Sequence, residues 1–479
     1  MRKILIIIWF FISSALLYGQ NIENALRFSS SNGIITSRAG GLGVAYHGIA
    51  DDLSAISFNP AGLALIDKGE ISFGMGFMIN STETDFLGIK TSLSSNDAYI
   101  SNFGVVAPFK TQLGNASIGF GYFLESNFNN TMEFGAINPH STYSNFTARD
   151  AYDMGYGLDE NFATNLWLAD DFYETPIKNG LYQEATISEK GGLHNITGGI
   201  AFELTPFLTA GFSLNGKWGK YEYLREYKET DVNGLYQVYD SDSIDGKLRF
   251  HDVDFDQLIV DELIDQYISG ISAAFGIQGK VSDFMRIGLS VKFPTYYDIE
   301  EDYSQNATAR FDNNEKFDDR YIFENSYSFV SPWVFSGGMS VHFLGATIAA
   351  GFEYTDITQM EFTDALYDLK TLNIAIVKDM TSRIKWGVGA EYEIPLTPVA
   401  IRASFSSTSA PYKNDIDGAE LITAAFGAGI YLAPNVRMDL LGRWSDYSNM
   451  WNIYGSSEDT ELVFKRNPLD LGLQLTYRY

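Results

Sequence analysis

The sequence predicts an all-β protein, a transmembrane antiparallel β-barrel of about fourteen strands with an N-terminal plug in its lumen. Three observations predict this fold. Segments of about ten residues alternate between apolar and small or polar residues along much of the chain, which is the pattern of a barrel that faces lipid. No apolar run after residue 20 is long enough for a membrane helix. The Gly- and Ala-rich stretch before the first alternating run has no period of two.

Residues 1–20 have the layout of a secretory signal peptide. Two basic residues precede an apolar run over residues 4–17, so we expect cleavage at Gly19 or Gln20. A transmembrane anchor is the alternative, but the run is shorter than the roughly 20 residues that a spanning helix needs. No other apolar run reaches that length, so a mature protein that lies in a membrane must cross it as strands.

The composition fits a barrel and excludes several other classes. The chain has 29 Tyr, 35 Phe and 44 Gly against 12 Pro, and aromatic residues suit pleated surfaces and membrane interfaces. Its 33 basic and 60 acidic residues give a formal charge of −27, which argues against binding nucleic acid. The absence of cysteine excludes disulfides and thiolate metal sites.

Alternating segments recur from residue 70 to the end of the chain. The clearest ones cover residues 71–80, 208–218, 285–293, 384–392 and 469–479. A soluble β-sandwich is the alternative, but it would bury the interleaved Lys and Arg residues unpaired, whereas a barrel lumen tolerates them. The last segment ends on Tyr479. This end resembles the C-terminal strand that the barrel assembly machinery of bacterial outer membranes recognises.

The spacing of turns predicts the strand count. Short linkers lie near residues 107–115, 204–207, 281–284, 343–345, 394–398 and 433–435, and long acidic connections lie at about 128–192, 225–268, 297–324 and 359–382. Such barrels have short periplasmic turns and long outer loops. Each of the six short turns joins two strands, and a first and a last strand bring the total to about fourteen. We therefore expect a plug at residues 21–69 and a barrel at residues 70–479.

The predicted plug also carries a motif that resembles a known family. Arg38-Ala39-Gly40-Gly41-Leu42-Gly43 is followed by Ala45-Tyr46, Ile49-Ala50-Asp51-Asp52 and Asn59-Pro60-Ala61-Gly62-Leu63. This order resembles the FadL/TodX family of outer-membrane transporters for long-chain fatty acids and other hydrophobic compounds. The resemblance implies a fourteen-stranded barrel plugged by an N-terminal hatch with an Asn-Pro-Ala motif.

The same residues have a physical interpretation. Pro60 restricts Asn59 to extended backbone, so we expect Asn59, Pro60, Ala61 and Gly62 to form the fixed corner of a gate. Asp51 or Asp52 can cap a short helix over residues 53–56. A nucleotide-binding loop is the alternative for the Gly-rich start, but no strand precedes it and no βαβ unit follows.

Lysines and arginines face inward on the predicted strands. They are Lys217, Arg286, Lys292, Lys385, Arg402, Arg437, Arg443 and Arg478. We predict that one or two of them, with Lys385, Arg437, Arg402 and Arg443 as the candidates, bind the carboxylate of a fatty acid. The alternative is that these cations pair with Asp51 and Asp52 of the plug, or with Glu391 and Asp439 of the wall.

Together with the resemblance, these patterns predict passive uptake of hydrophobic small molecules, such as fatty acids or hydrocarbons, across the outer membrane of a Gram-negative bacterium. We expect no enzyme activity, no cofactor and no metal, and we expect contacts with outer-membrane lipid. In some family members the ligand leaves sideways through the barrel wall. Gly119 and Gly121 could mark such an opening, since Gly within a strand often marks a kink.

Four alternatives stay open at this stage. A barrel of the PorV type, which shuttles secreted proteins, has the same fold as the transporter. A scattered Ser, His and Asp triad of a barrel enzyme is not visible in sequence. Asp252, Asp254 and Asp256 could bind calcium loosely in an outer loop, although the EF-hand pattern fails there. The apolar spacing over residues 255–268 predicts a short loop helix that could line a groove for an apolar ligand.

Overall fold

The computed structural model describes residues 22–30, 33, 35–112, 114–155, 157–363, 369–454 and 460–479. The expected signal peptide over residues 1–20 lies outside these ranges. Within them, no helix has both the length and the apolar character to cross a membrane.

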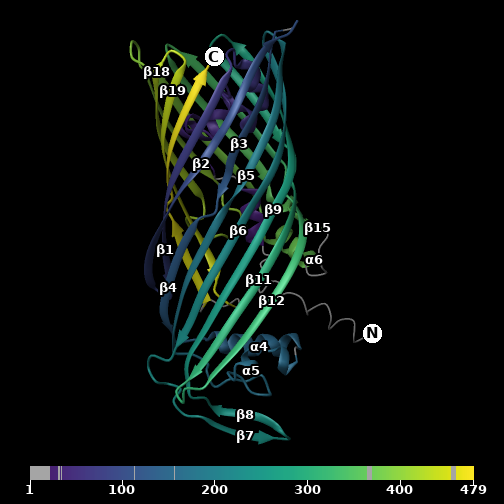
Figure 1. Cartoon of the computed structure of the whole chain (residues 1–479), viewed down its shortest axis with the longest axis vertical. Helices are drawn as coiled ribbons and strands as arrows, with labels where there is room; N and C mark the ends of the chain where they lie inside the picture. The colour runs from purple at the N-terminus through teal and green to yellow at the C-terminus, as the bar shows by residue number, and fades with distance from the viewer. Residues whose placement is uncertain are drawn as a thin grey trace.

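Fourteen antiparallel strands close into a barrel in which the first strand pairs with the last, as expected (Figure 1). Ten strands are continuous: β1 (Glu70–Phe86), β2 (Ile89–Lys110), β5 (Leu181–Thr205), β6 (Leu208–Thr230), β9 (Phe255–Ser282), β14 (Ala346–Asp356), β16 (Ser382–Glu393), β17 (Val399–Thr408), β18 (Leu421–Ala433) and β19 (Val436–Asn452). Four strands are interrupted: β3 (Asn115–Asn127) with β4 (Asn130–Asn138), β10 (Met285–Lys292) with β11 (Tyr296–Phe311), β12 (Lys316–Val330) with β13 (Val334–Phe343), and β20 (Glu461–Arg466) with β21 (Leu469–Arg478).

All six short turns that we predicted lie at one end of the barrel. They cover residues 111–114, 206–207, 283–284, 344–345, 394–398 and 434–435. The barrel also closes here, because the Gly69 amide donates to the Tyr479 carbonyl at 3.0 Å and the Tyr479 amide donates back at 2.9 Å. The short turns, the start of β1 and the end of β21 identify this end as the periplasmic one.

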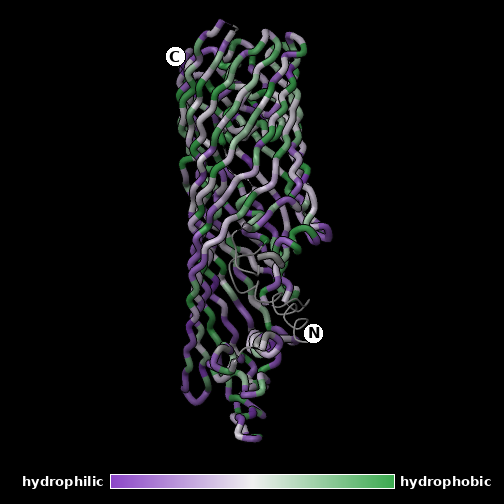
Figure 2. The backbone as a smooth tube through the Cα atoms, turned by 90° about the vertical axis from the view of Figure 1, so that its right-hand side faces the viewer, coloured by the Kyte–Doolittle hydropathy of each residue, from purple (hydrophilic) through white to green (hydrophobic). Residues whose placement is uncertain are grey.

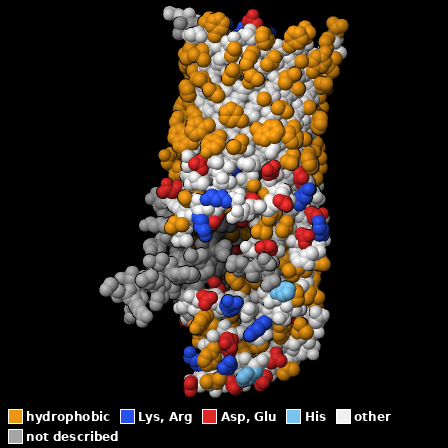
Figure 3. All heavy atoms as spheres, turned by 180° about the vertical axis from the view of Figure 1, so that it is seen from behind, with side chains coloured by type: hydrophobic (Ala, Val, Ile, Leu, Met, Phe, Trp, Pro, Cys, Tyr) orange, Lys and Arg blue, Asp and Glu red, His pale blue; other side chains and the backbone are white. Residues whose placement is uncertain are grey.

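Large apolar side chains cover the outside of the half of the barrel nearest these turns (Figure 3). Hydrophobic residues recur along the strands of this half (Figure 2). Examples are Ile71, Phe73, Phe212, Trp218 and Leu473, each at least 40% exposed. Charged side chains gather where this band ends (Figure 3). In lipid, only a helix or a closed barrel can pair all its backbone groups, so the apolar band is the surface that spans the outer membrane.

The wall is much taller on one side than on the other. The strands β5, β6 and β9 have 25, 23 and 28 residues, whereas β14, β16, β17 and β18 have 11, 12, 10 and 13. Figure 1 shows β9, β11 and β12 on the tall side extending past the level of β15 and α6. We call the four short strands the short wall. Beyond it lie η6 (Ile357–Gln359), β15 (Glu361–Thr363) and α6 (Leu369–Asp379).

A cap covers the outer end of the tall strands (Figure 1). It contains α4 (Tyr143–Met154), η5 (Leu158–Glu160), α5 (Phe162–Asn165) and the hairpin of β7 (Asp240–Ile244) with β8 (Lys247–Asp252). Its apolar side chains pack in one cluster with those of the barrel strands, for example Tyr143 and Leu166 with Leu258 and Phe464.

Three of the four outer connections that we predicted to be long are shorter than expected, and the fourth has about the predicted length. They cover residues 139–180, 231–254, 312–315 and 357–381. The long loop expected at 297–324 is wrong, because β11 and β12 continue through it. The helix expected over residues 255–268 is also wrong, because this stretch pairs along its length with β6 and β11 as part of β9. Among the described residues no group of three metal-binding side chains forms, which leaves Asp252, Asp254 and Asp256 without a built calcium site.

The N-terminal part of the chain folds into short helices inside the barrel. They are α1 (Ile22–Ser29), α2 (Ser37–Leu42), η3 (Gly43–Gly48), α3 (Ala55–Phe58) and η4 (Pro60–Leu65). The first helix packs in an apolar cluster with Tyr221, Tyr297 and Met360, separate from the cluster that the later helices form. We call residues 36–66 the plug segment and treat α1 separately.

Candidate functional site

The plug segment occupies the barrel lumen at the level of the apolar band. Its helix α2 contacts the strands from β16 to β19 and β21, η3 contacts β10, β13, β14, β16 and β17, and η4 contacts β3, β5, β6 and β9. Its apolar residues, such as Leu42, Tyr46, Ile56 and Leu63, are fully buried. A barrel of this width is not filled by its own side chains, and the plug segment packs into this part of the lumen.

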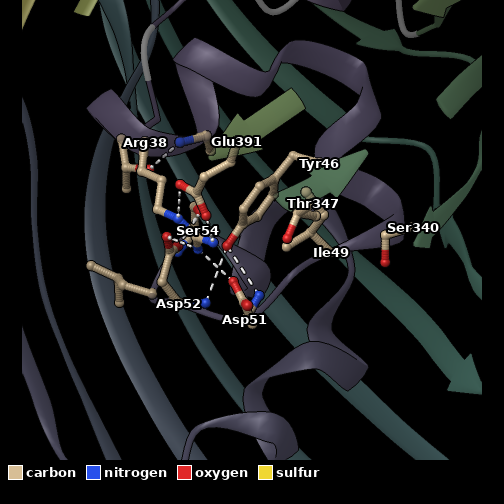
Figure 4. Close-up of polar contacts among 12 residues, drawn as sticks. Arg38, Tyr46, Ile49, Asp51, Asp52, Ser54, Ser340, Thr347 and Glu391 are labelled. Atoms are coloured by element: carbon tan, nitrogen blue, oxygen red, sulfur yellow. Dashed lines mark hydrogen bonds and ion pairs between the residues drawn. The ribbon is translucent and has the colours of Figure 1, made fainter. Parts of the chain in front are cut away.

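Arg38 ties the plug segment to the short wall (Figure 4). Its guanidinium donates twice to Glu391 on β16, at 2.8 and 3.1 Å. The same guanidinium pairs with Asp51 and, at 3.1 Å, with Asp52, both in the plug segment. The side chain of Arg38 is only 8% exposed. Bidentate pairs between Arg and carboxylates are strong when buried, so Arg38 is the central ionic anchor of the plug segment.

Two further contacts fix the loop that carries these acids. The Tyr46 hydroxyl accepts hydrogen bonds from the amides of Asp51 and Asp52, both at 3.1 Å. The Asp52 carboxylate accepts from the Ser54 amide at 2.9 Å. The helix α3 begins at Ala55, and its N-cap Ser54 has no side-chain capping bond, so the capping that we expected from Asp51 or Asp52 is wrong. The carboxylates are therefore held in place toward Arg38.

The turn expected at Asn59-Pro60-Ala61 is present. The Asn59 side-chain oxygen accepts from the Ala61 amide at 3.2 Å, and its amide group donates to the Ile277 carbonyl of β9 at 3.1 Å. A Cβ added to Gly62 would lie 1.8 Å from the Ala50 carbonyl oxygen, so only glycine fits here. The corner is thus bonded to itself and to the wall.

Glycines of the wall let the backbone of the plug segment approach closely. A Cβ on Gly211, Gly276, Gly288, Gly338 or Gly351 would lie between 2.0 and 2.4 Å from an atom of the plug segment. Several of these glycines are cross-strand partners: Gly211 faces Gly276, and Gly338 faces both Gly288 and Gly351. Together these glycines form a strip of the wall that has no side chains, and the plug segment packs against this strip.

We expect G211A to displace the plug segment without affecting the barrel. The added methyl group meets backbone atoms of Pro60 and Ala61 at 2.4 and 2.5 Å, and overpacking of this kind costs about 1–3 kcal/mol. Hydrogen exchange in residues 55–65 should become faster. The matched control is G216A on the same strand, where nothing lies within 4 Å of the added Cβ. Equal exchange in both variants would contradict this packing.

The four cations predicted to bind a ligand are all paired with acids of the chain. Arg402 contacts Glu391 and, at 2.8 Å, Asp439, and Arg437 contacts Asp439 at 2.9 Å. The others form the pairs Arg443–Asp470 at 2.7 Å and Lys385–Glu353 at 3.7 Å. The alternative pairing with Glu391 and Asp439 is therefore the arrangement found for Arg402 and Arg437. The acids Asp51 and Asp52 pair instead with Arg38.

Lys385 differs from the other three because its side chain is 34% exposed inside the lumen. Arg383, two residues before it, faces the same way. Its guanidinium donates to the Ser30 hydroxyl at 3.1 Å, and no carboxylate lies within 4 Å of it among the residues described. Glu353 completes the group and contacts His47 of the plug segment at 3.0 Å. We call Arg383, Lys385 and Glu353 the lumenal charge group.

Sequence reasoning missed Arg38, Arg383 and His47 as site residues. Arg38 was part of the family motif, and an arginine within a Gly- and Ala-rich stretch that is expected to be buried requires an acidic partner. Arg383 lies two residues before Lys385 on an alternating strand, so the period of two could have predicted that it faces the lumen as well. Nothing in the sequence indicates that His47 reaches Glu353, because the two residues are 306 positions apart.

The wall has a seam between β2 and the strand made of β3 and β4. The pairing of β2 with β3 ends at Asn102 and Phe123, and within the described structure residues 89–100 of β2 pair only with β1. Beyond a bulge between Leu124 and Ser126, the chain bends inward. There Asn130 of β4 accepts hydrogen bonds from the lumen-facing side chains of β1.

Gly119 and Gly121 do not mark this interruption. Both lie in continuous pairing, Gly119 with Val106 and Gly199, and Gly121 with Gly104 and Thr197. A Cβ on Gly119 would meet the side chains of the plug segment at 3.3 Å. Close packing against the plug segment therefore explains this glycine, and the kink lies further along the strand.

Comparison with known proteins identifies the fold. No family model matches the chain, and no curated protein matches its sequence. A FadL homologue of Pseudomonas aeruginosa has a TM-score of 0.57 at 11% identity, over 92% of this chain and 98% of that one. The toluene transporter TodX of Pseudomonas putida has a TM-score of 0.52 at 12% identity, over 89% and 94%. The fold is therefore that of the FadL/TodX outer-membrane transporters.

Proposed function

We propose that this protein is a passive channel for the uptake of hydrophobic small molecules across the outer membrane, and that the plug segment is its gate. One observation carries the proposal: the plug segment fills the lumen at the level of the apolar band, held by Arg38 on one side and by Asn59 on the other. A solute can then pass only when this segment moves. The similar fold of a toluene transporter and of a FadL homologue supports the same function.

The proposed path uses the two irregular parts of the wall. A ligand enters over the short wall, where the strands end close to the membrane surface. It leaves through the seam between β2 and β3, whose inner end reaches the apolar band at Ile100 and Phe103. In this proposal the seam takes the role that we predicted for Gly119 and Gly121. Transport follows the concentration gradient, and no catalytic step, cofactor or metal is assigned.

We propose further that the ligand carries an acidic head group, as a long-chain fatty acid does. Arg383 has no carboxylate partner in the described structure, and Lys385 is the most exposed of the predicted ligand-binding cations. A ligand carboxylate between them would supply charge-assisted hydrogen bonds. Arg402, Arg437 and Arg443 are occupied by wall acids, so the proposal leaves them the task of holding the wall and the plug segment.

Ligand binding by the purified barrel tests this assignment. We expect K385M and R383M each to weaken the binding of laurate by about tenfold, the loss of one modest interaction. The binding of toluene should not change. The matched control is K217M, which removes a lumenal lysine that is paired with Glu125 at 2.8 Å. Unchanged laurate binding in both K385M and R383M, with heat-modifiable folding intact, would contradict an acidic ligand at this site.

A broader experiment tests uptake itself. Native mass spectrometry of the detergent-purified protein should find a co-purified hydrophobic molecule. A pull-down from the same membranes should recover the barrel assembly machinery, through the strand that ends at Tyr479, but no secreted cargo. Recovery of cargo proteins in place of lipid would favour a PorV-like role in secretion and would overturn the proposal.

A further inference from the structure

Glu353 connects the gate with the proposed ligand site. It lies on β14, and its two oxygen atoms point to different partners. One lies 3.0 Å from Nε2 of His47 in the plug segment, and the other lies 3.7 Å from Nζ of Lys385 in the lumenal charge group. The exposed fraction of the side chains rises from 1% for His47 to 21% for Glu353 and 34% for Lys385. One carboxylate thus extends from the buried gate to the accessible lumen.

Few polar contacts hold the His47 ring. Its Nδ1 atom is buried and has no hydrogen-bond partner among the described residues. The ring packs edge-on against Phe58 of the plug segment itself, with centroids 5.1 Å apart. Glu353 is therefore the wall group that binds this side chain, and η3, the helix that carries His47, packs directly on β14.

We propose that Glu353 transmits the occupancy of the lumenal charge group to the plug segment. The inference rests on the proposed function, since it requires an anionic ligand at Lys385 and Arg383. A ligand carboxylate at Lys385 replaces Glu353 as the partner of that lysine and brings a second negative charge close to it. Repulsion in the partly desolvated lumen turns Glu353 away, and its contact with His47 breaks. The helix η3 then loses its side-chain bond to β14.

The coupling depends on charge, so it separates two kinds of hydrophobic solute. An alcohol or a hydrocarbon of the same chain length fills the same space and leaves Glu353 paired with Lys385. Such a molecule does not loosen η3 by this mechanism. Glu353 is a positioning residue in this scheme, because it acts on the gate through His47.

A single-cysteine reporter tests the coupling. The native chain has no cysteine, so V44C places a unique thiol in η3, where the native side chain is 2% exposed. Laurate should raise the rate of maleimide labelling about tenfold, which corresponds to about 1.4 kcal/mol in the opening equilibrium of η3. An equal concentration of 1-dodecanol should leave the rate unchanged. An equal response to both compounds would overturn the role of charge.

Two variants in the V44C background test the connection itself. E353Q removes the charge, and H47Q cuts the contact from the side of the plug segment. Both should bind laurate and should lose the laurate-dependent increase in labelling. The matched control is E125Q, which alters a wall carboxylate bonded to Lys217 and should keep the increase. A laurate response that persists in both E353Q and H47Q would overturn the proposal.

Measuring laurate binding in the same samples separates this inference from the proposed function. Binding to the V44C protein without faster labelling overturns the coupling and leaves the transport proposal intact. Absence of laurate binding overturns the acidic-ligand proposal and the coupling with it. Heat-modifiable mobility on gels confirms that each variant is folded before it is compared.

Discussion

Deleting residues 37–62 should leave a folded barrel that leaks small solutes. The strand ladder closes through β1 and β21 without using these residues, so heat-modifiable mobility should persist. The lumen loses the packed helices, and the wall behind them consists largely of glycine, as at Gly211, Gly276 and Gly338. No wall side chain there can fill the space. The deleted region opens toward Lys385 and Glu353, which already contact solvent.

Conductance in planar bilayers measures this leak. The full-length protein should be closed, and the deletion variant should show ion-conducting steps under the same conditions. In cells, the variant should sensitise the outer membrane to large antibiotics. A deletion variant that is folded and non-conducting would show that other parts of the chain, such as α1 or the cap, close the barrel by themselves.

Removing the charge of Arg38 should release the plug segment while the barrel stays folded. The substitution R38A leaves Asp51 and Asp52 without their cation, whereas Glu391 keeps Arg402 as a partner. Removing one partner of a buried ion pair costs about 3–5 kcal/mol. Where that cost falls on the plug segment, its opening equilibrium shifts by a factor of about 10² to 10⁴.

Hydrogen exchange of residues 44–58 measures the shift. These amides should exchange much faster in R38A, and those of the barrel ladder should not change. The matched control is R286A, which removes a lumen-facing arginine that forms no ion pair among the described residues. Slow exchange of the plug segment in R38A would mean that neutral contacts, such as those of Asn59, suffice to hold it.

Much of the barrel could be predicted from the sequence, because one physical pattern specifies it. The alternation of apolar and small residues fixed which residues face the lipid, and the turn chemistry fixed the six periplasmic hairpins. The pattern fails where β11 and β12 leave the membrane, because their outer face is then polar and resembles a loop. It also fails at residues 255–268, where apolar residues on both faces of β9 imitate helical spacing.

The candidate site was less predictable, because its contacts join residues far apart in the sequence. The parity of the strands placed Lys385, Arg402 and Arg437 inward, and charge balance suggested Glu391 and Asp439 as partners. Whether a cation is paired or free depends on which residues lie opposite it on the neighbouring strands. Pairing across β16 and β17 places Arg402 directly opposite Glu391, whereas in the part of the chain that the structure describes Arg383 bonds to a serine hydroxyl and to no carboxylate.

A reversible lock on the plug segment tests the central claim most directly. Ala45 lies in η3, and a Cβ built on Gly389 of β16 would lie 3.3 Å from its Cβ. Disulfides need about 3.5–4.5 Å between these atoms, so A45C with G389C can form one after a small shift. The native chain has no cysteine, so no other disulfide can form within one chain. Proteoliposomes that contain the reduced protein should take up laurate. This uptake should stop when the disulfide forms and should resume after reduction. Equal uptake in the oxidised and reduced forms would contradict the claim that the plug segment is the gate.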